Sequence, residues 1–119
     1  MKVLFLHLKK KWFDMIQSGE KLEEYREMSE YYISRFMDFS SIVSNCARFV
    51  EMAYAATHPE EDKYFKKFDK VVFFLGYPRR NDVNKRIEFD NPRIRIGHGR
   101  EEWGTDPEDY YFVITWNKK

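Results

Sequence analysis

After Asp69 the chain reads as a series of strands with no helical segment between them, and this order limits the fold more than any other feature. An unbroken apolar run, Val71 to Leu75, is typical of a strand covered on both faces. Alternating apolar residues then predict strands over Val83 to Phe89, Arg93 to Ile96 and Tyr110 to Trp116. A doubly wound parallel sheet needs helices between its strands, so this order disfavours that fold.

The first third of the chain mixes strand and helix. Val3 to Leu8 predicts a buried strand, and Lys9 to Ser18 places apolar residues at helical spacing. Gly19 follows as the residue that ends the helix. A second strand, over Gly19 to Arg26, brings the total to about six, with Asp90-Asn91-Pro92 as a turn between two of the later ones. We therefore expect an α+β fold, a small and partly open mixed β-barrel with helices packed against it.

The middle of the chain is helical in pattern. Ser29 is a suitable N-cap, and from Ile33 to Ala53 apolar residues recur at helical spacing, with Ser40-Ser41 as a point where the helix can divide. His58 precedes a proline and therefore resists helical geometry. A short helix over Glu60 to Phe68 is expected next.

Composition narrows the class of protein. The chain has 119 residues, of which 43% are hydrophobic, and this suits one domain over residues 1–119. Its single cysteine, Cys46, excludes an internal disulfide and any zinc site of several cysteines, and the helical pattern places Cys46 in the core. We expect a reduced, cytoplasmic protein without a membrane segment. The net charge of +1 provides no overall field that would attract nucleic acid.

The charges are nevertheless segregated along the chain. Residues 14–30 carry six acidic side chains and two basic ones, whereas residues 79–100 carry seven basic and three acidic. The later block includes Arg79, Arg80 and Arg100 and is the candidate surface for phosphate groups. His7 and His98 are too isolated in the sequence to suggest a metal site, and no cofactor is expected.

The run from Gly19 to Arg26 concentrates charge within a few residues of a glycine turn. If it is a strand, Leu22, Glu24 and Arg26 share one face, and Leu22 is the residue suited to point inward. Charges beside an inward apolar residue are costly unless they are paired or used. The alternative is a solvated edge strand, whose ion pairs contribute little.

Three ordered blocks carry a resemblance to a known family. The first is Gly-x-Lys-x-x-Glu-x-Arg, met by Gly19, Lys21, Glu24 and Arg26; the others are Leu6 to Ile16 upstream and Ile96 to Gly104 downstream. In these blocks the chain resembles the ASCH family, a branch of the PUA-like barrels. Residues of about 32–66 fall outside the blocks and look like a helical insertion that varies within the family.

The resemblance implies a ligand and a set of roles. Members of the family are thought to bind RNA or modified nucleosides, and some resemble amidohydrolases that remove the acetyl group of N4-acetylcytidine. In those enzymes a lysine is the base, a threonine the nucleophile and a late glutamate the proton donor. Lys21 matches the lysine and Glu102 the late glutamate, but Glu24 stands in place of the threonine.

That departure changes the chemistry. A carboxylate that attacked an amide would form a mixed anhydride, so Glu24 fits better as a general base on water, with Lys21 stabilising the oxyanion and Glu102 protonating the leaving amine.

Three functions therefore remain open, and the sequence does not decide whether the protein is an enzyme. The first is binding of RNA or a nucleotide in a charged cleft. Its expected ligand-binding residues are Lys21, Arg26, Arg79, Arg80, Arg100 and Trp103. The second is hydrolysis of an acylated nucleoside, or of RNA, through Lys21, Glu24 and Glu102. The third is a protein-interaction module that uses the helical insertion, and the oligomeric state is left open.

Two of these residues have alternative roles. Arg26 suits either a contact with phosphate or a pairing role that holds Glu24, and Trp103 suits either base stacking or packing.

Overall fold

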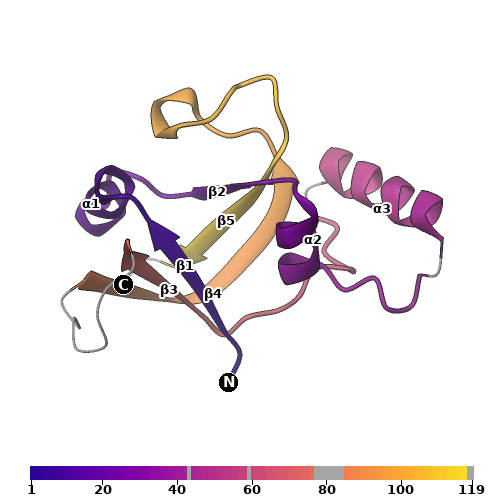
Figure 1. Cartoon of the computed structure of the whole chain (residues 1–119), viewed down its shortest axis with the longest axis horizontal. Coiled ribbons are helices and arrows are strands. Elements are labelled where there is room, and N and C mark those ends of the chain that lie inside the picture. The colour runs from indigo at the N-terminus through magenta and orange to yellow at the C-terminus, as the bar shows by residue number, and fades with distance from the viewer. Residues whose placement is uncertain (43, 59, 77–84, 118–119) are drawn as a thin grey trace. The chain divides into compact units, whose positions relative to one another are not determined.

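The computed structural model describes residues 1–42, 44–58, 60–76 and 85–117, and over these residues the chain is an α+β fold (Figure 1). One five-stranded sheet has the strand order β1-β3-β4-β5-β2, and three α-helices accompany it. The elements are β1 (Val3–Leu8), α1 (Lys10–Ser18), β2 (Glu24–Glu27), α2 (Glu30–Phe36), α3 (Asn45–Thr57), β3 (Lys70–Leu75), β4 (Arg86–Gly97), the 3-10 helix η2 (Glu101–Trp103) and β5 (Tyr111–Asn117). The expected mixture of strands and helices is confirmed, and within the described residues two of the expected strands form the single strand β4.

The chain divides into two compact units, each built from segments that are distant in sequence. The first unit contains the described residues of 1–24, 67–93 and 115–119, and the second contains those of 25–66 and 94–114.

In the first unit β1 runs parallel to β3, in a register that pairs Val3 with Lys70 and Leu8 with Leu75. Alternate β1 side chains, Leu4, Leu6 and Leu8, are buried, as the apolar pattern predicts. Parallel strands need a long crossover connection, and here it begins with α1, which buries Phe13 and Ile16.

Hydrogen bonds fix both ends of this parallel pair. The amide of Lys2 donates to the Asp69 carboxylate at 2.7 Å, and the amide of Asp69 donates back to the Lys2 carbonyl at 2.7 Å. At the other end the amide of Gly76 donates to the Leu8 carbonyl at 2.7 Å. The register of β1 on β3 is therefore held at its first and last residues.

Aromatic rings fill the rest of this core. Phe73 of β3 meets Phe89 of β4 with ring centroids 6.1 Å apart, and it meets Trp116 of β5 at 5.0 Å. Phe89 and Trp116 stack on each other at 5.2 Å. Three strands thus contribute to one aromatic cluster.

The predicted turn at Asp90-Asn91-Pro92 is wrong, because β4 continues through it. Asp90 pairs with Lys70 in the antiparallel β3–β4 ladder, and the amide of Asn91 donates to the Asp69 carbonyl at 3.0 Å. Pairing with β3 and with Asp69, the residue before it, therefore satisfies backbone groups of this segment that a turn would direct away from β3. The cost is a left-handed conformation at Asn91, with φ of 52°, which Asn tolerates better than most residues.

In the second unit, the segment expected to be a variable insertion packs against β5. The ring of Phe112 meets Phe36 of α2 at 5.1 Å and Phe65 at 6.4 Å, both edge to face, and all three side chains are buried. The hydroxyl of Ser29 accepts from the amide of Tyr32 and caps α2, as predicted.

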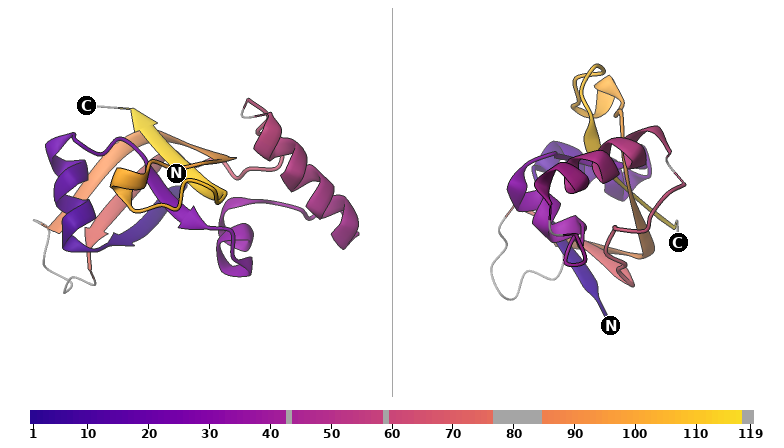
Figure 2. Two further views of the ribbon diagram at one scale, coloured as in Figure 1. Left: turned by 90° about the horizontal axis from the view of Figure 1, so that it is seen from above. Right: turned by 90° about the vertical axis from the view of Figure 1, so that its right-hand side faces the viewer.

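The helical part of residues 33–57 divides as expected, but a short helix over residues 60–68 does not form. Figure 2 shows α2 and α3 as separate helices, and α3 ends at Thr57, just before His58. The amide of Lys66 donates to the Phe36 carbonyl and the amide of Asp38 to the Tyr64 carbonyl, both at 2.8 Å. These bonds join residues 64–66 to the end of α2 and to Asp38, and they take the place of the hydrogen bonds that a helix over residues 60–68 would form.

Candidate functional site

The turn after α1 explains why the motif lysine is buried. Gly19 ends the helix in the left-handed conformation, with φ of 85°, and its amide donates to the Ile16 carbonyl. The amide of Lys21 then donates back to the Met15 carbonyl at 2.9 Å. The chain therefore folds over the end of α1, and Lys21 enters the protein here instead of lying on a strand.

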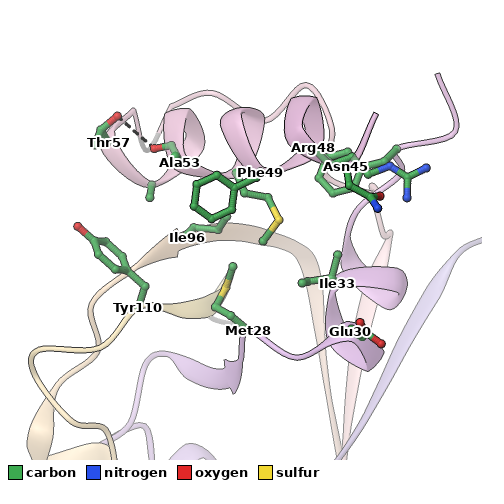
Figure 3. Close-up of a pocket in the computed structure, with 13 residues that line it drawn as sticks. Met28, Glu30, Ile33, Asn45, Arg48, Phe49, Ala53, Thr57, Ile96 and Tyr110 are labelled. Carbon is green, nitrogen blue, oxygen red and sulfur yellow. Dashed lines mark hydrogen bonds between the residues drawn. The ribbon is translucent and has the colours of Figure 1, made fainter. Parts of the chain in front are cut away.

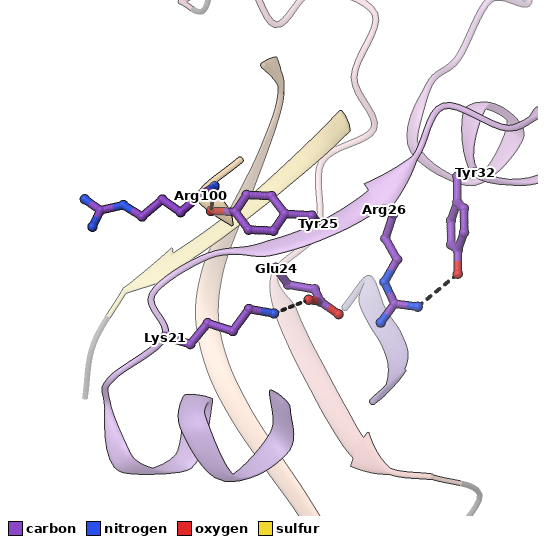
Figure 4. A network of polar contacts seen from close by, with 6 residues as sticks. All are labelled: Lys21, Glu24, Tyr25, Arg26, Tyr32 and Arg100. Atoms are coloured by element: carbon purple, nitrogen blue, oxygen red, sulfur yellow. Dashed lines mark hydrogen bonds and ion pairs between the residues drawn. The ribbon is translucent and has the colours of Figure 1, made fainter. Parts of the chain in front are cut away.

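Lys21 and Glu24 form a buried ion pair in the first unit (Figure 4). The ammonium lies 2.6 Å from the Glu24 carboxylate, and the two side chains are only 1% and 7% exposed. The same ammonium lies 4.8 Å from the centroid of the Trp12 ring. Buried charges are costly unless they are paired, and here both the carboxylate and the aromatic face lie close to the ammonium.

This geometry corrects the expected alternation along residues 19–26. The strand begins only at Glu24, Lys21 is buried, and Leu22, expected to point inward, is exposed. The reading of Lys21 as a solvated edge residue is therefore wrong. The one feature of the sequence that indicated this buried pair was the spacing of three residues between Lys21 and Glu24, directly after a glycine that ends a helix.

In the second unit Arg26 is held by α2. Its guanidinium donates to the Tyr32 hydroxyl at 2.9 Å and lies 5.7 Å from the centroid of that ring (Figure 4). Hydrogen bonding and cation–π contact from one tyrosine fix the direction of the side chain. Arg26 is partly buried, so the bond also links β2 to the start of α2.

The loop from Gly97 to Gly104 carries the other expected site residues of this unit. Arg100 lies 3.5 Å from Glu102 in an ion pair whose side chains are both more than half exposed, and its guanidinium lies 4.9 Å from the centroid of the Trp103 ring. Trp103 is buried, so its main role here is packing. Arg100, Glu101 and Glu102 are the charged residues that the loop exposes to solvent.

Tyr25 fixes this loop, a role that the sequence analysis missed. Its hydroxyl accepts from the amide of Arg100 at 3.2 Å (Figure 4). A Cβ placed on Gly99 would lie 2.4 Å from the Thr105 side chain and 2.9 Å from the Tyr25 ring, so only glycine fits there. In the sequence, Gly99 itself was the feature that could have indicated this contact, since glycine is common where two backbone segments or side chains approach closely.

Each unit holds some of the predicted site residues. Lys21 joins Glu24 in the first unit, whereas the second unit holds Arg26 with Tyr32, and Arg100 with Glu102 and Trp103. Arg79 and Arg80 lie outside the described residues. Elsewhere in the basic block, Arg86 pairs with Glu88 and Arg93 is exposed.

A cavity of 780 Å³ lies in the second unit, among α2, α3 and the end of β4. Its walls are mainly apolar, with Phe49 on one side and Met28 and Ile96 on the other (Figure 3). The Arg48 guanidinium at its border is engaged, since two of its nitrogens donate to the Ile42 carbonyl at 3.2 and 3.0 Å. This volume is in the range of small-ligand pockets.

Among the described residues, no group of three or more His, Cys, Asp or Glu side chains is placed to hold a metal ion. In the same part of the chain, no helix has the length and apolar character needed to cross a bilayer. No family model, curated protein or solved structure matches the chain.

Proposed function

We propose that the protein binds RNA or a nucleotide as a PUA-like module of the ASCH kind, through the charged residues of its Gly-x-Lys-x-x-Glu-x-Arg motif. The observation that carries the proposal is the buried pair of Lys21 and Glu24 beside Trp12. A buried ion pair contributes little to stability compared with apolar residues of the same size. Its presence directly after a glycine turn therefore favours a functional role.

A second set of contacts is proposed for the loop of the second unit. Arg100 is exposed, and its guanidinium is planar and suited to a phosphate. Glu102 beside it sets the direction of the guanidinium when no ligand is bound. Phosphate contacts release counterions from RNA, so affinity for the ligand falls as salt concentration rises.

Titration of a short fluorescent single-stranded RNA tests this proposal. Arg100→Ala is expected to weaken binding and to reduce the salt slope by about one. Lys10→Ala is the matched control, because Lys10 is also an exposed cation in an ion pair, with Asp14, and its loss should leave binding unchanged. RNA affinity equal to that of the wild type in both Arg100→Ala and Lys21→Met would refute the proposed contacts.

Hydrolysis of an acylated nucleoside is a second candidate, favoured by the 2.6 Å distance between an amine and a carboxylate. In this reaction water adds to the acetyl carbon, Glu24 accepts the water's proton, and Lys21 stabilises the oxyanion. The C–N bond then breaks as the proton passes to the leaving nitrogen. The products are acetate and cytidine when the substrate is N4-acetylcytidine.

Incubation with N4-acetylcytidine, followed by chromatography of the products, distinguishes the two candidates. Hydrolysis requires release of cytidine by the wild type and its loss in Glu24→Gln. RNA binding without cytidine release supports the first proposal alone. Release that survives in Glu24→Gln would exclude Glu24 as the base.

A further inference from the structure

The outer face of the sheet in the first unit carries a group of aromatic rings. There β1, β3 and β4 lie next to one another (Figure 1). The leucines of β1 are buried, so the alternating Phe5 and His7 lie on the opposite face, and both are exposed. Phe74 of β3 lies on this face as well, because its ring stacks with both of theirs. We call these three rings the aromatic platform.

The rings of the aromatic platform are close together and nearly parallel. The Phe74 ring is centred 5.8 Å from that of Phe5 and 5.3 Å from that of His7, and the planes differ by 16° and 26°. Nδ1 of His7 lies 2.6 Å from the Gly76 carbonyl oxygen, and it donates the hydrogen because a carbonyl only accepts. The platform is therefore fixed before a ligand arrives, which lowers the cost of binding.

Two cations border the aromatic platform. Arg86 of β4 lies opposite Phe74 in the β3–β4 ladder, with its guanidinium 5.7 Å from the centroid of that ring, and it also pairs with Glu88. Lys9 comes two residues after His7 in extended backbone, with φ of −68° and ψ of 155°, and it is exposed. The Lys9 ammonium has no hydrogen-bond or ion-pair partner within the described part of the chain. One cation therefore holds a ring of the platform, and the other can meet an anion.

We propose that the aromatic platform stacks bases of single-stranded nucleic acid, with Lys9 contacting the phosphate backbone. Sheet-based RNA-binding modules stack bases on aromatic side chains of one sheet face, and such stacking accepts any base because every base has a π-face. Phe5 and His7 are the exposed rings on which bases stack, and the half-buried Phe74 supports both. A strand of bases and phosphates supplies flat faces for the rings and negative charge for the ammonium.

The same chemistry disfavours a purely apolar partner. An apolar protein surface or an acyl chain would take water from Lys9 without giving it a partner, and such burial of a charge is costly. A phosphate keeps the ammonium paired. The inference does not rest on the proposed function, because none of its residues belongs to the Gly-x-Lys-x-x-Glu-x-Arg motif or to the loop with Arg100. Stacking makes no use of the ribose hydroxyl, so DNA should bind as well as RNA.

Fluorescence anisotropy with a labelled oligodeoxythymidylate of about 10 nucleotides tests the platform, since this length suits a single-strand site. Phe5→Leu keeps an apolar side chain but removes the ring. It should weaken binding by about 5-fold to 150-fold, the effect of losing one stacked base. Phe49→Leu is the matched control, because it makes the same change at another exposed phenylalanine and should leave the affinity unchanged.

Two further variants examine the cation and the stacking contact separately. Lys9→Ala should reduce the salt slope of binding by about one, whereas Lys10→Ala should not, because that ammonium is paired with Asp14. Phe5→Trp keeps a ring, so it should bind at least as tightly as the wild type. Stacked bases should quench the fluorescence of the added tryptophan, so the oligonucleotide should quench this variant more than the wild type.

Wild-type affinity in Phe5→Leu overturns the proposal, as does a lack of extra quenching in Phe5→Trp. Failure of the wild type to bind the oligonucleotide overturns it as well. Arg100→Ala separates this inference from the proposed function. If RNA binding weakens in Arg100→Ala but not in Phe5→Leu, the platform is wrong and the proposed function stands, whereas the reverse result supports the platform alone.

Discussion

The ammonium of Lys21 lies 2.6 Å from the carboxylate of Glu24, and both side chains are almost completely buried. The glycine turn after α1 brings Lys21 to this position, and β2 begins at Glu24. The pair is therefore built by local structure on both sides. Each charge neutralises the other at this buried position, so loss of one partner leaves the other less well compensated.

Removing one partner should accordingly cost far more than removing both. Lys21→Met leaves a buried carboxylate and Glu24→Leu leaves a buried ammonium, and each is expected to lower the free energy of unfolding by about 3–5 kcal/mol. The double variant should recover most of this loss, because two apolar side chains of similar volume fill the space. Urea denaturation of the four proteins gives the coupling energy. Additive losses in the double variant would mean that the two charges do not interact in solution.

Gly99 is predicted to be irreplaceable even by alanine. The added methyl group would lie 2.4 Å from the Thr105 side chain and 2.9 Å from the Tyr25 ring. We expect Gly99→Ala to lower the free energy of unfolding by about 1–3 kcal/mol, as overpacking does.

Gly97→Ala is the control, because the nearest atom to its added Cβ is 3.9 Å away. This change should be neutral or slightly stabilising, since alanine reduces the freedom of the unfolded chain. Thermal unfolding of both variants measures the difference. Equal effects at the two glycines would show that the close approach at Gly99 is absent.

The left-handed conformation of Asn91 gives a third prediction. Asn91→Ala should cost about 1 kcal/mol, because a Cβ without a polar side chain disfavours φ of 52°. Asn91→Gly should change the free energy of unfolding by only about a few tenths of a kcal/mol, since glycine adopts positive φ freely. Chemical denaturation separates the two outcomes. A turn in place of the continuous strand would instead tolerate both substitutions alike.

Asn91 also illustrates what the sequence could and could not predict. The elements that depend on neighbouring residues were predicted well: the strand Val3–Leu8, the helix α1 and the ending of that helix at Gly19. The turn at Asp90-Asn91-Pro92 was wrong because the backbone there pairs with Lys70 and Asp69, which lie about twenty residues earlier. Local turn preference does not contain that pairing.

The candidate site, too, was predicted where it depends on neighbouring residues and missed where it depends on distant ones. The motif spacing singled out Lys21 and Glu24, but their burial depends on Trp12 and on the turn that folds back to Met15. Cys46 was placed in the core because it belongs to an apolar stripe of α3 with Phe49 and Val50. That stripe is exposed and Ala55 is buried instead, so periodicity predicted the helix but not which side faces inward. Tyr25 was overlooked because its partner is a backbone amide seventy-five residues later.

Tyr25→Phe is expected to loosen the loop that carries Arg100. The lost hydroxyl accepts from the Arg100 amide at 3.2 Å, so stability should fall by about 0.5–1.5 kcal/mol and exchange of that amide hydrogen should accelerate. Tyr111→Phe provides a matched control in the same unit, because the Tyr111 hydroxyl accepts from the Asp106 amide at 2.9 Å. Each variant should therefore release its own amide and leave the other protected. Amide exchange measured by NMR reports both positions at once, and unchanged protection of Arg100 in Tyr25→Phe would show that this hydroxyl does not hold the loop.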